Sequence, residues 1–198
     1  MAEAQAREQR RGRRWAMKAL FMWDAQGGGD AEALVREAVR MELVPAEHGE
    51  DAEGAEGGSP AGRGGGRPDG LPSEVADGAA ARFAASLVAG TVTNLAVIDA
   101  LLESLAPAWG PGRMAAVDRA LLRLGCYEIM YGETPEAVAV SEAVDLARAY
   151  STSESPRFVN GILGAVAPRR PGGGPGRPPR ARAGAAAPPA VRRRGGPV

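Results

Sequence analysis

The stretch that decides the fold spans residues 113–166 and reads RMAAVDRALLRLGCYEIMYGETPEAVAVSEAVDLARAYSTSESPRFVNGILGAV. Its apolar residues recur at steps of three and four, which is the period of an amphipathic α-helix. Thr134-Pro135 and Ser155-Pro156 divide the stretch into three segments. A hydroxyl residue followed by proline is a typical helix start, because the hydroxyl can cap the helix and proline lacks an N–H there. We therefore predict three consecutive helices.

The first of these helices is apolar on nearly every side. Only a narrow stripe formed by Asp118, Arg119 and Arg123 is polar, and we expect this stripe to face water. A helix of this kind must lie in the middle of a bundle, with other helices packed around it. The expected fold class is therefore all-α.

The same periodicity predicts four more helices upstream. They are expected over residues 6–26 with a stop at 27–29, from the cap Asp30 to about residue 44, from near Ser73 through Val88, and from Leu95 to Leu105. This gives a compact bundle of about seven helices, with the first two or three in one subdomain and the last four in the other. No alternating run of strand length competes with them.

Two segments have a composition that does not favour folding. Many of the 28 glycines and 16 prolines fall in an insertion at about residues 46–72 and in the tail 168–198. Neither segment has enough apolar side chains to offset the entropy lost on ordering, so both are expected to be disordered. The expected organisation is one helical domain over residues 1–167, interrupted by the insertion and followed by an Arg/Pro/Gly-rich tail.

The formal net charge of zero conceals a separation of charge along the chain. The tail 168–198 contains eight arginines and no acid, so the remaining 16 basic and 24 acidic residues give the body a net charge of −8. Further basic residues gather near the amino terminus. Basic ends on an acidic body indicate a localised contact with a polyanion.

Several classes of function are disfavoured by the residue inventory. One cysteine gives no disulfide framework, and one histidine gives no partner for a zinc site or a His-based triad. We find no apolar run of membrane-spanning length and no signal-peptide pattern. We therefore expect a cytoplasmic protein that is not an enzyme, with no catalytic residues, no cofactor, no metal and no membrane contact.

Several sequence blocks resemble the NusB family of bacterial transcription antitermination factors, in the order in which that family has them. The blocks are RRWAMKALFMW at 13–23, LVAG at 87–90, ID at 98–99, VDRALLRL at 117–124, YE at 127–128, VSEAVDLA at 140–147 and FVNGIL at 158–163. They cover roughly residues 7–167 apart from the insertion.

This resemblance implies a two-subdomain helical fold and a function without catalysis. The implied RNA ligand is boxA-type single-stranded RNA in transcripts of ribosomal RNA operons. The implied protein partner is NusE, a ribosomal small-subunit protein, within an antitermination complex that helps RNA polymerase to read through terminators.

The basic tract formed by Arg10, Arg11, Arg13 and Arg14 is the first candidate RNA-binding site. Guanidinium groups match phosphate oxygens in bidentate geometry, and this tract leads directly into a helix. The alternative is a solvated helix start, although cations at that end oppose the helix dipole.

Phe158 is the second candidate. An aromatic residue in the first turn of a helix can be half exposed and stack on a base. The alternative from spacing is a core phenylalanine four residues before Ile162. The resemblance implies that Phe158, the basic Arg157 before it and the acid Glu154 lie at the RNA surface.

Asp118 is the third candidate. As an acid on an otherwise apolar helix, it can be a cap-region acid or the partner of a nearby arginine. The resemblance instead implies that it faces NusE, and an acidic surface suits a basic ribosomal protein.

Two other functions remain open at this stage. One is a NusB-like RNA-binding domain related to an rRNA methyltransferase, although no glycine-rich strand–loop–helix follows in this chain. The other is a helical adaptor that binds only proteins, with basic ends that serve solubility.

Overall fold

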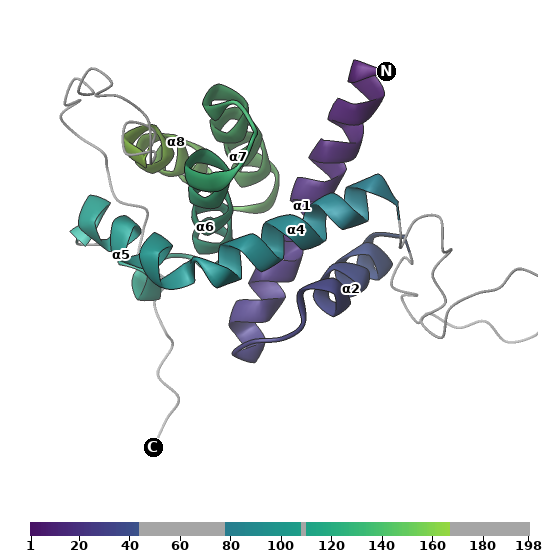
Figure 1. The fold of residues 1–198 in the computed structure, drawn as a ribbon. Helices are drawn as coiled ribbons and strands as arrows, with labels where there is room; N and C mark the ends of the chain where they lie inside the picture. Colours follow the sequence, from purple (N-terminus) through teal and green to yellow (C-terminus); the bar gives the residue numbers. More distant parts are fainter. Residues whose placement is uncertain (44–77, 108–109, 167–198) are drawn as a thin grey trace, which may run out of the picture. The chain divides into compact units, whose positions relative to one another are not determined.

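The computed structural model describes residues 1–43, 78–107 and 110–166, and the described chain is helical throughout (Figure 1). The elements are α1 (Ala2–Gln26), α2 (Ala31–Leu43), α4 (Ala79–Thr93), α5 (Leu95–Leu105), the 3-10 turn η2 (Pro111–Arg113), α6 (Ala116–Tyr131), α7 (Glu136–Tyr150) and α8 (Ser155–Val166). No strand occurs within the described ranges. The all-α class with about seven helices is confirmed.

The expected insertion and tail, and the helix start near Ser73, lie outside the described residues. The described chain divides into two compact units, Met1–Ala89 and Gly90–Val198, and the boundary falls inside α4. This division is consistent with the expected two subdomains. Among the described residues no single helix is long and apolar enough to cross a membrane, although α4 and α5, bent by 72°, pass that test as a pair.

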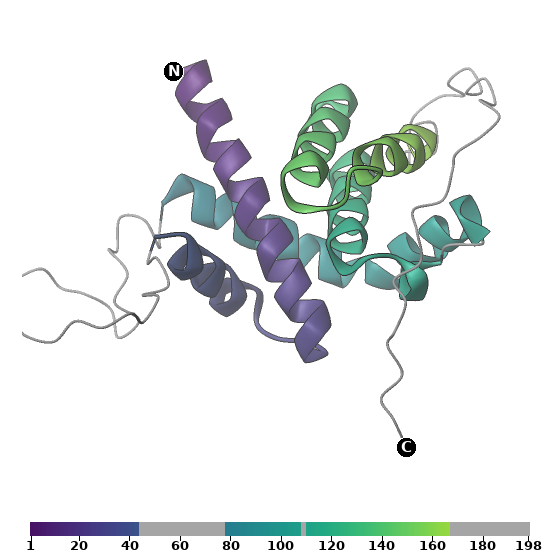
Figure 2. The ribbon, with the colours of Figure 1, turned by 180° about the vertical axis from the view of Figure 1, so that it is seen from behind.

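The first unit is built on a hairpin of α1 and α2, which pack against each other (Figure 2). Gly27 ends α1 in the left-handed conformation, with φ 74°, and its N–H donates to the Trp23 carbonyl. A side chain disfavours that conformation, which is why glycine stops the helix here. Asp30 caps α2 as predicted, because its Oδ1 accepts the Ala33 N–H at 2.8 Å.

Helix α4 approaches α1 closely at Gly12. A Cβ atom at that position would lie 2.8 Å from both the Ala80 carbonyl oxygen and Phe83 Cδ1. Glycine therefore lets the two helices come together where any other residue would separate them. Trp15, Leu20, Val39 and Val88 are among the buried residues that form the core of this unit.

The second unit is built around α6, which packs against α5, α7 and α8 (Figure 1). Ten of its 16 residues are buried, so the prediction of a central helix is confirmed. The prediction that its polar stripe faces water is wrong. Asp118 is 1% exposed and Arg123 is 8% exposed, while Arg119 donates to the carbonyls of Pro111 and Met114.

Each buried charge on α6 is satisfied by a residue from another segment. Arg123 makes a bidentate pair with Asp99 of α5, at 2.8 and 2.7 Å. Glu128 accepts a hydrogen bond from the Thr134 hydroxyl at 2.9 Å. Thr134 therefore joins the end of α6 to the start of α7, whereas the sequence suggested a helix cap; Pro135, directly before α7, supplies no side-chain cap.

Candidate nucleic-acid interface

The four arginines of the basic tract lie on α1 in three different environments. Helical spacing turns each residue by about 100°, so a run of basic side chains cannot all face the same way. Arg10 and Arg11 are exposed, Arg14 is half-buried and Arg13 is buried. The tract is therefore not a uniform basic surface.

Arg11 has only weak intramolecular partners. Its Nη1 lies 3.6 Å from Glu8 Oε1, and both side chains are well exposed. The guanidinium carbon also lies 5.9 Å from the centroid of the Trp15 ring. Exposed ion pairs contribute little to stability, so Arg11 can exchange Glu8 for a phosphate at small cost.

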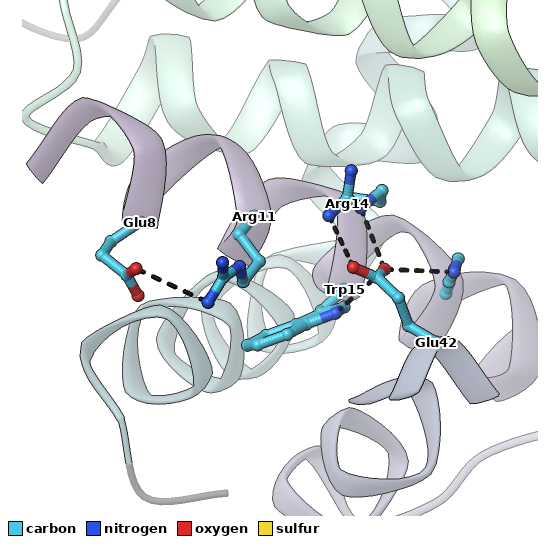
Figure 3. A network of polar contacts seen from close by, with 6 residues as sticks. Glu8, Arg11, Arg14, Trp15 and Glu42 are labelled. Carbon is cyan, nitrogen blue, oxygen red and sulfur yellow. Dashed lines mark hydrogen bonds and ion pairs between the residues drawn. The ribbon is translucent and has the colours of Figure 1, made fainter. Parts of the chain in front are cut away.

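Arg14 is held by a carboxylate of α2, Glu42 (Figure 3). The guanidinium donates through Nε and Nη2 to the two Glu42 oxygens at 2.9 and 2.5 Å. Trp15 Nε1 donates to the same carboxylate at 3.1 Å, and Lys18 Nζ lies 3.4 Å from it. This network joins α1 to the end of α2, so Arg14 has a structural role that the sequence pattern did not reveal.

Arg13 is 2% exposed, and its guanidinium carbon lies 5.3 Å from the centroid of the Phe83 ring. A cation over an aromatic face is stabilised by the ring quadrupole, most of all where water is excluded. Such a side chain cannot reach a phosphate without leaving the interior. Its burial does not support the expected RNA contact, so Arg13 does not belong to the exposed basic surface of α1.

The second unit brings Glu154, Arg157 and Phe158 together at the start of α8. Glu154 and Arg157 are exposed, and Phe158 is half-buried. The Phe158 N–H donates to the Glu154 carbonyl at 3.2 Å, which closes the first turn. A ring that is partly held by packing and partly open to solvent can stack on a base without having to be ordered first.

Asp118 lies in the interior of the same unit. Its Oδ1 accepts the Ser151 hydroxyl at 2.7 Å, and its Oδ2 accepts the Ser155 hydroxyl at 2.8 Å. An acid that is 1% exposed presents no surface to another protein. The expected contact of Asp118 with NusE is therefore not supported by this position. Its carboxylate accepts two serine hydroxyls from other segments, and α6 itself has no side-chain cap.

Sequence reasoning missed Glu42 and Ser151, which hold candidate residues in place. It predicted Ser155 as the start of a helix, which is confirmed, but not that the Ser155 hydroxyl bonds Asp118. The hydroxyl-rich run from Ser151 to Ser155 directly before Pro156 was a signal for a bonded turn. Nothing in the sequence pairs that turn with Asp118, more than thirty residues earlier. The contact depends on how α6, α7 and α8 pack.

No group of three or more His, Cys, Asp or Glu that could hold a metal occurs in the described part of the chain. Cys126 is fully buried, and burial raises the pKa of its thiol to about 12, with the charge of Asp99 acting in the same direction. A protonated, buried thiol is neither a nucleophile nor a metal ligand.

The family model and the curated relatives that match this chain all belong to one family. The model of a family described as the NusB family matches residues 70–168, which is half of the chain. "Transcription antitermination protein NusB" of Saccharopolyspora erythraea is 53% identical over 83 residues, covering 41% of this chain and 56% of that protein. The protein of the same name from a Nocardioides species is 52% identical over 86 residues, covering 43% and 64%. The matched region thus spans about three fifths of these relatives.

Solved structures agree with the fold. T. maritima NusB is 28% identical, with a TM-score of 0.60, over 82% of this chain and 92% of that chain. A structure described as "Antitermination Factors NusB and NusE in complex with dsRNA" has a TM-score of 0.59 over 81% and 96%, at 23% identity. At that identity the likeness concerns the fold alone.

Proposed function

Since this chain belongs to the NusB family, we propose that it is a transcription antitermination factor that binds RNA and catalyses no reaction. Its ligand is boxA-type single-stranded RNA in nascent ribosomal RNA transcripts. It pairs there with NusE, and the complex helps RNA polymerase to read through terminators. We expect it to act in the cytoplasm, where those transcripts are made.

The observation that carries the proposal is the first turn of α8, where a half-buried Phe158 lies beside exposed Arg157 and Glu154. This turn offers one aromatic ring for a base and one guanidinium for a phosphate. Stacking of a base on an aromatic side chain contributes about 1–3 kcal/mol and tolerates different bases. Glu154 can accept hydrogen bonds from base amino groups, which is the usual way in which carboxylates contribute to base selection.

Exposed arginines of α1 supply further phosphate contacts. Arg10 and Arg11 are exposed, and Arg14 is half-buried with Glu42 as its partner. We therefore assign the electrostatic part of RNA binding to Arg10 and Arg11, with Arg14 contributing only if phosphate competes with Glu42. Each phosphate neutralised on a single strand changes the slope of log affinity against log salt by about −0.7.

Pairing with NusE is proposed from the relatives and not from a particular surface of this chain. A structural neighbour is described as a complex of NusB and NusE with dsRNA, and that statement concerns the neighbour. A basic ribosomal protein suits the acidic body of this chain, which has a net charge of −8 outside the tail, from 16 basic and 24 acidic residues.

Titration with a boxA-type RNA, with and without NusE, tests the proposal. The Arg10→Ala/Arg11→Ala variant is expected to bind this RNA more weakly and to make the salt slope shallower by about 1.4. The matched control is Arg36→Ala/Arg148→Ala, which removes two charges from α2 and α7 and is expected to leave both quantities unchanged. Equal binding of boxA-type RNA, unrelated RNA and duplex RNA, with no effect of NusE, would contradict the proposed function.

A further inference from the structure

A buried carboxylate and three hydroxyl groups join α6 to the start of α8. Asp118, in the first turn of α6, is 1% exposed, and its two oxygens accept the hydroxyls of Ser151 and Ser155 at 2.7 and 2.8 Å. Ser155 is the first residue of α8 and is fully buried. The Thr152 hydroxyl lies 2.9 Å from the Ser155 hydroxyl.

The hydrogens of this cluster can be assigned by counting donors. A serine hydroxyl carries one hydrogen and accepts through two lone pairs. Ser155 lies within reach of both Asp118 and the Ser151 hydroxyl, and the carboxylate is the stronger acceptor. Ser151 and Ser155 therefore each give their hydrogen to Asp118, which leaves Thr152 as the donor to Ser155. Every hydrogen then has an acceptor.

The cluster lies at the first residue of α8 and holds its side chain. The first amides of a helix have no partner within it, so an unsupported first turn frays. Here the Ser155 N–H donates to the Thr152 carbonyl at 3.1 Å, and the Ser155 hydroxyl donates to Asp118. Phe158 follows three residues later, and its N–H closes the turn on the Glu154 carbonyl. Whatever holds Ser155 therefore also orders the backbone turn that carries Phe158.

We propose that Asp118, acting through Ser155 and Ser151, is a positioning residue that holds Phe158 ready to stack on RNA. This inference rests on the function proposed above. Asp118 itself touches no RNA. Its contribution is to order the first turn of α8 before binding, so that RNA binding does not have to order it.

A double-mutant cycle between Ser155 and Phe158 tests this inference. Ser155→Ala is expected to weaken binding of a boxA-type RNA about 2–10-fold, the effect of having to immobilise one side chain on binding. The salt slope is expected to stay unchanged, because no arginine is lost. In the Phe158→Ala background, Ser155→Ala is expected to cost clearly less affinity than in the parent protein, since there is no ring left to position and only Arg157 and Glu154 remain on this turn.

Thr134→Ala is the matched control. Thr134 makes the same type of bond, hydroxyl to buried carboxylate at 2.9 Å, but at the start of α7. Its loss is expected to lower the thermal unfolding temperature to a similar extent without changing RNA affinity. A 4-fluorophenylalanine at position 158 gives a second readout, because its ¹⁹F resonance in the free protein is expected to shift and sharpen in Ser155→Ala and not in Thr134→Ala.

The outcomes separate this inference from the proposed function. If Phe158→Ala binds RNA as well as the parent protein, the stacking role proposed for Phe158 fails. If Phe158→Ala weakens binding while Ser155→Ala does not, or if the two losses simply add, the positioning role of Asp118 is overturned. Should Ser155→Ala not fold, Ser151→Ala replaces it, since Ser151 is only half-buried and donates to the same carboxylate.

Discussion

Single residues in this protein take their properties from burial more than from their type. Cys126 is the clearest case, because it lies fully inside the second unit and its thiol has a pKa of about 12. Its neighbours in α6 are mostly apolar, and the thiol is buried among them. The surroundings of Asp118 and Arg123 were not predicted, because their partners Ser155 and Asp99 come from distant segments.

We predict that Cys126 resists alkylation in the folded protein. Iodoacetamide at pH 8 is expected to leave the native chain unmodified for hours and to label it within minutes in denaturant, because only a thiolate reacts and only unfolding exposes it. Mass spectrometry measures the label, and the chain has no other cysteine to confuse the count. Rapid labelling of the native protein would show that the second unit opens far more readily than its packing indicates.

The same thiol makes the folded state sensitive to alkaline pH. The pKa of Cys126 is raised from 9.0 to about 12 on folding, so above pH 9 the unfolded chain loses a proton that the folded chain keeps. The stabilisation is complete below about pH 9 and is lost as the pH rises towards 12. Urea unfolding at a series of pH values is expected to show this decline, and Cys126→Ala is expected to show less of it.

Helices were the level at which prediction from sequence was most accurate. The bounds of α1 and α2 were predicted to within a few residues. The signals used were the helical period of apolar residues, the cap at Asp30 and the glycine stop at Gly27, all of which are local. The sequence did not reveal which helices touch. The close approach of α1 and α4 at Gly12 depends on packing between segments. A glycine in the sequence does not by itself predict which helix will pack against it.

Glycines in two helices are expected to respond to alanine in opposite ways. Gly12→Ala places a Cβ 2.8 Å from the Ala80 carbonyl oxygen and should destabilise the protein by about 1–3 kcal/mol through overpacking. Gly164→Ala in α8 meets nothing within 4 Å and should stabilise it by about 0.5–1 kcal/mol through helix propensity. Chemical denaturation of both variants measures the difference. If Gly12→Ala left the free energy of unfolding unchanged, α4 would be able to move away from α1 at no cost.

At the scale of the whole molecule, sequence blocks identified the family and charge counting identified the basic ends. Neither the sequence blocks nor the charge count shows which arginines of the basic tract are exposed and which are buried. Arg11 and Arg13 are equivalent in the sequence, yet one is exposed and the other lies buried over Phe83. The rotation of α1 about its axis, set by packing against its neighbours, decides that Arg11 and not Arg13 is exposed to water.

The tail 168–198 is predicted to add RNA affinity without adding selectivity. It carries eight arginines and no acid, and charge of this kind attracts every polyanion alike. A chain ending at residue 167 is expected to bind boxA-type and unrelated RNA more weakly by the same factor, with a shallower salt slope. Replacing the eight arginines by glutamine keeps the length and should reproduce the loss. A loss confined to boxA-type RNA would instead give the tail a role in sequence selection.

The three buried charges of α6 bear on how uniquely this protein folds. Asp118, Arg123 and Glu128 each meet a partner from a different segment. A central helix with only leucine and alanine on its surface could pack against its neighbours at several rotations about its own axis. We expect any other rotation of α6 to separate these three buried side chains from their partners, which would disfavour misaligned packing. Amide protons along α6 should consequently exchange with deuterium only through opening of the whole second unit.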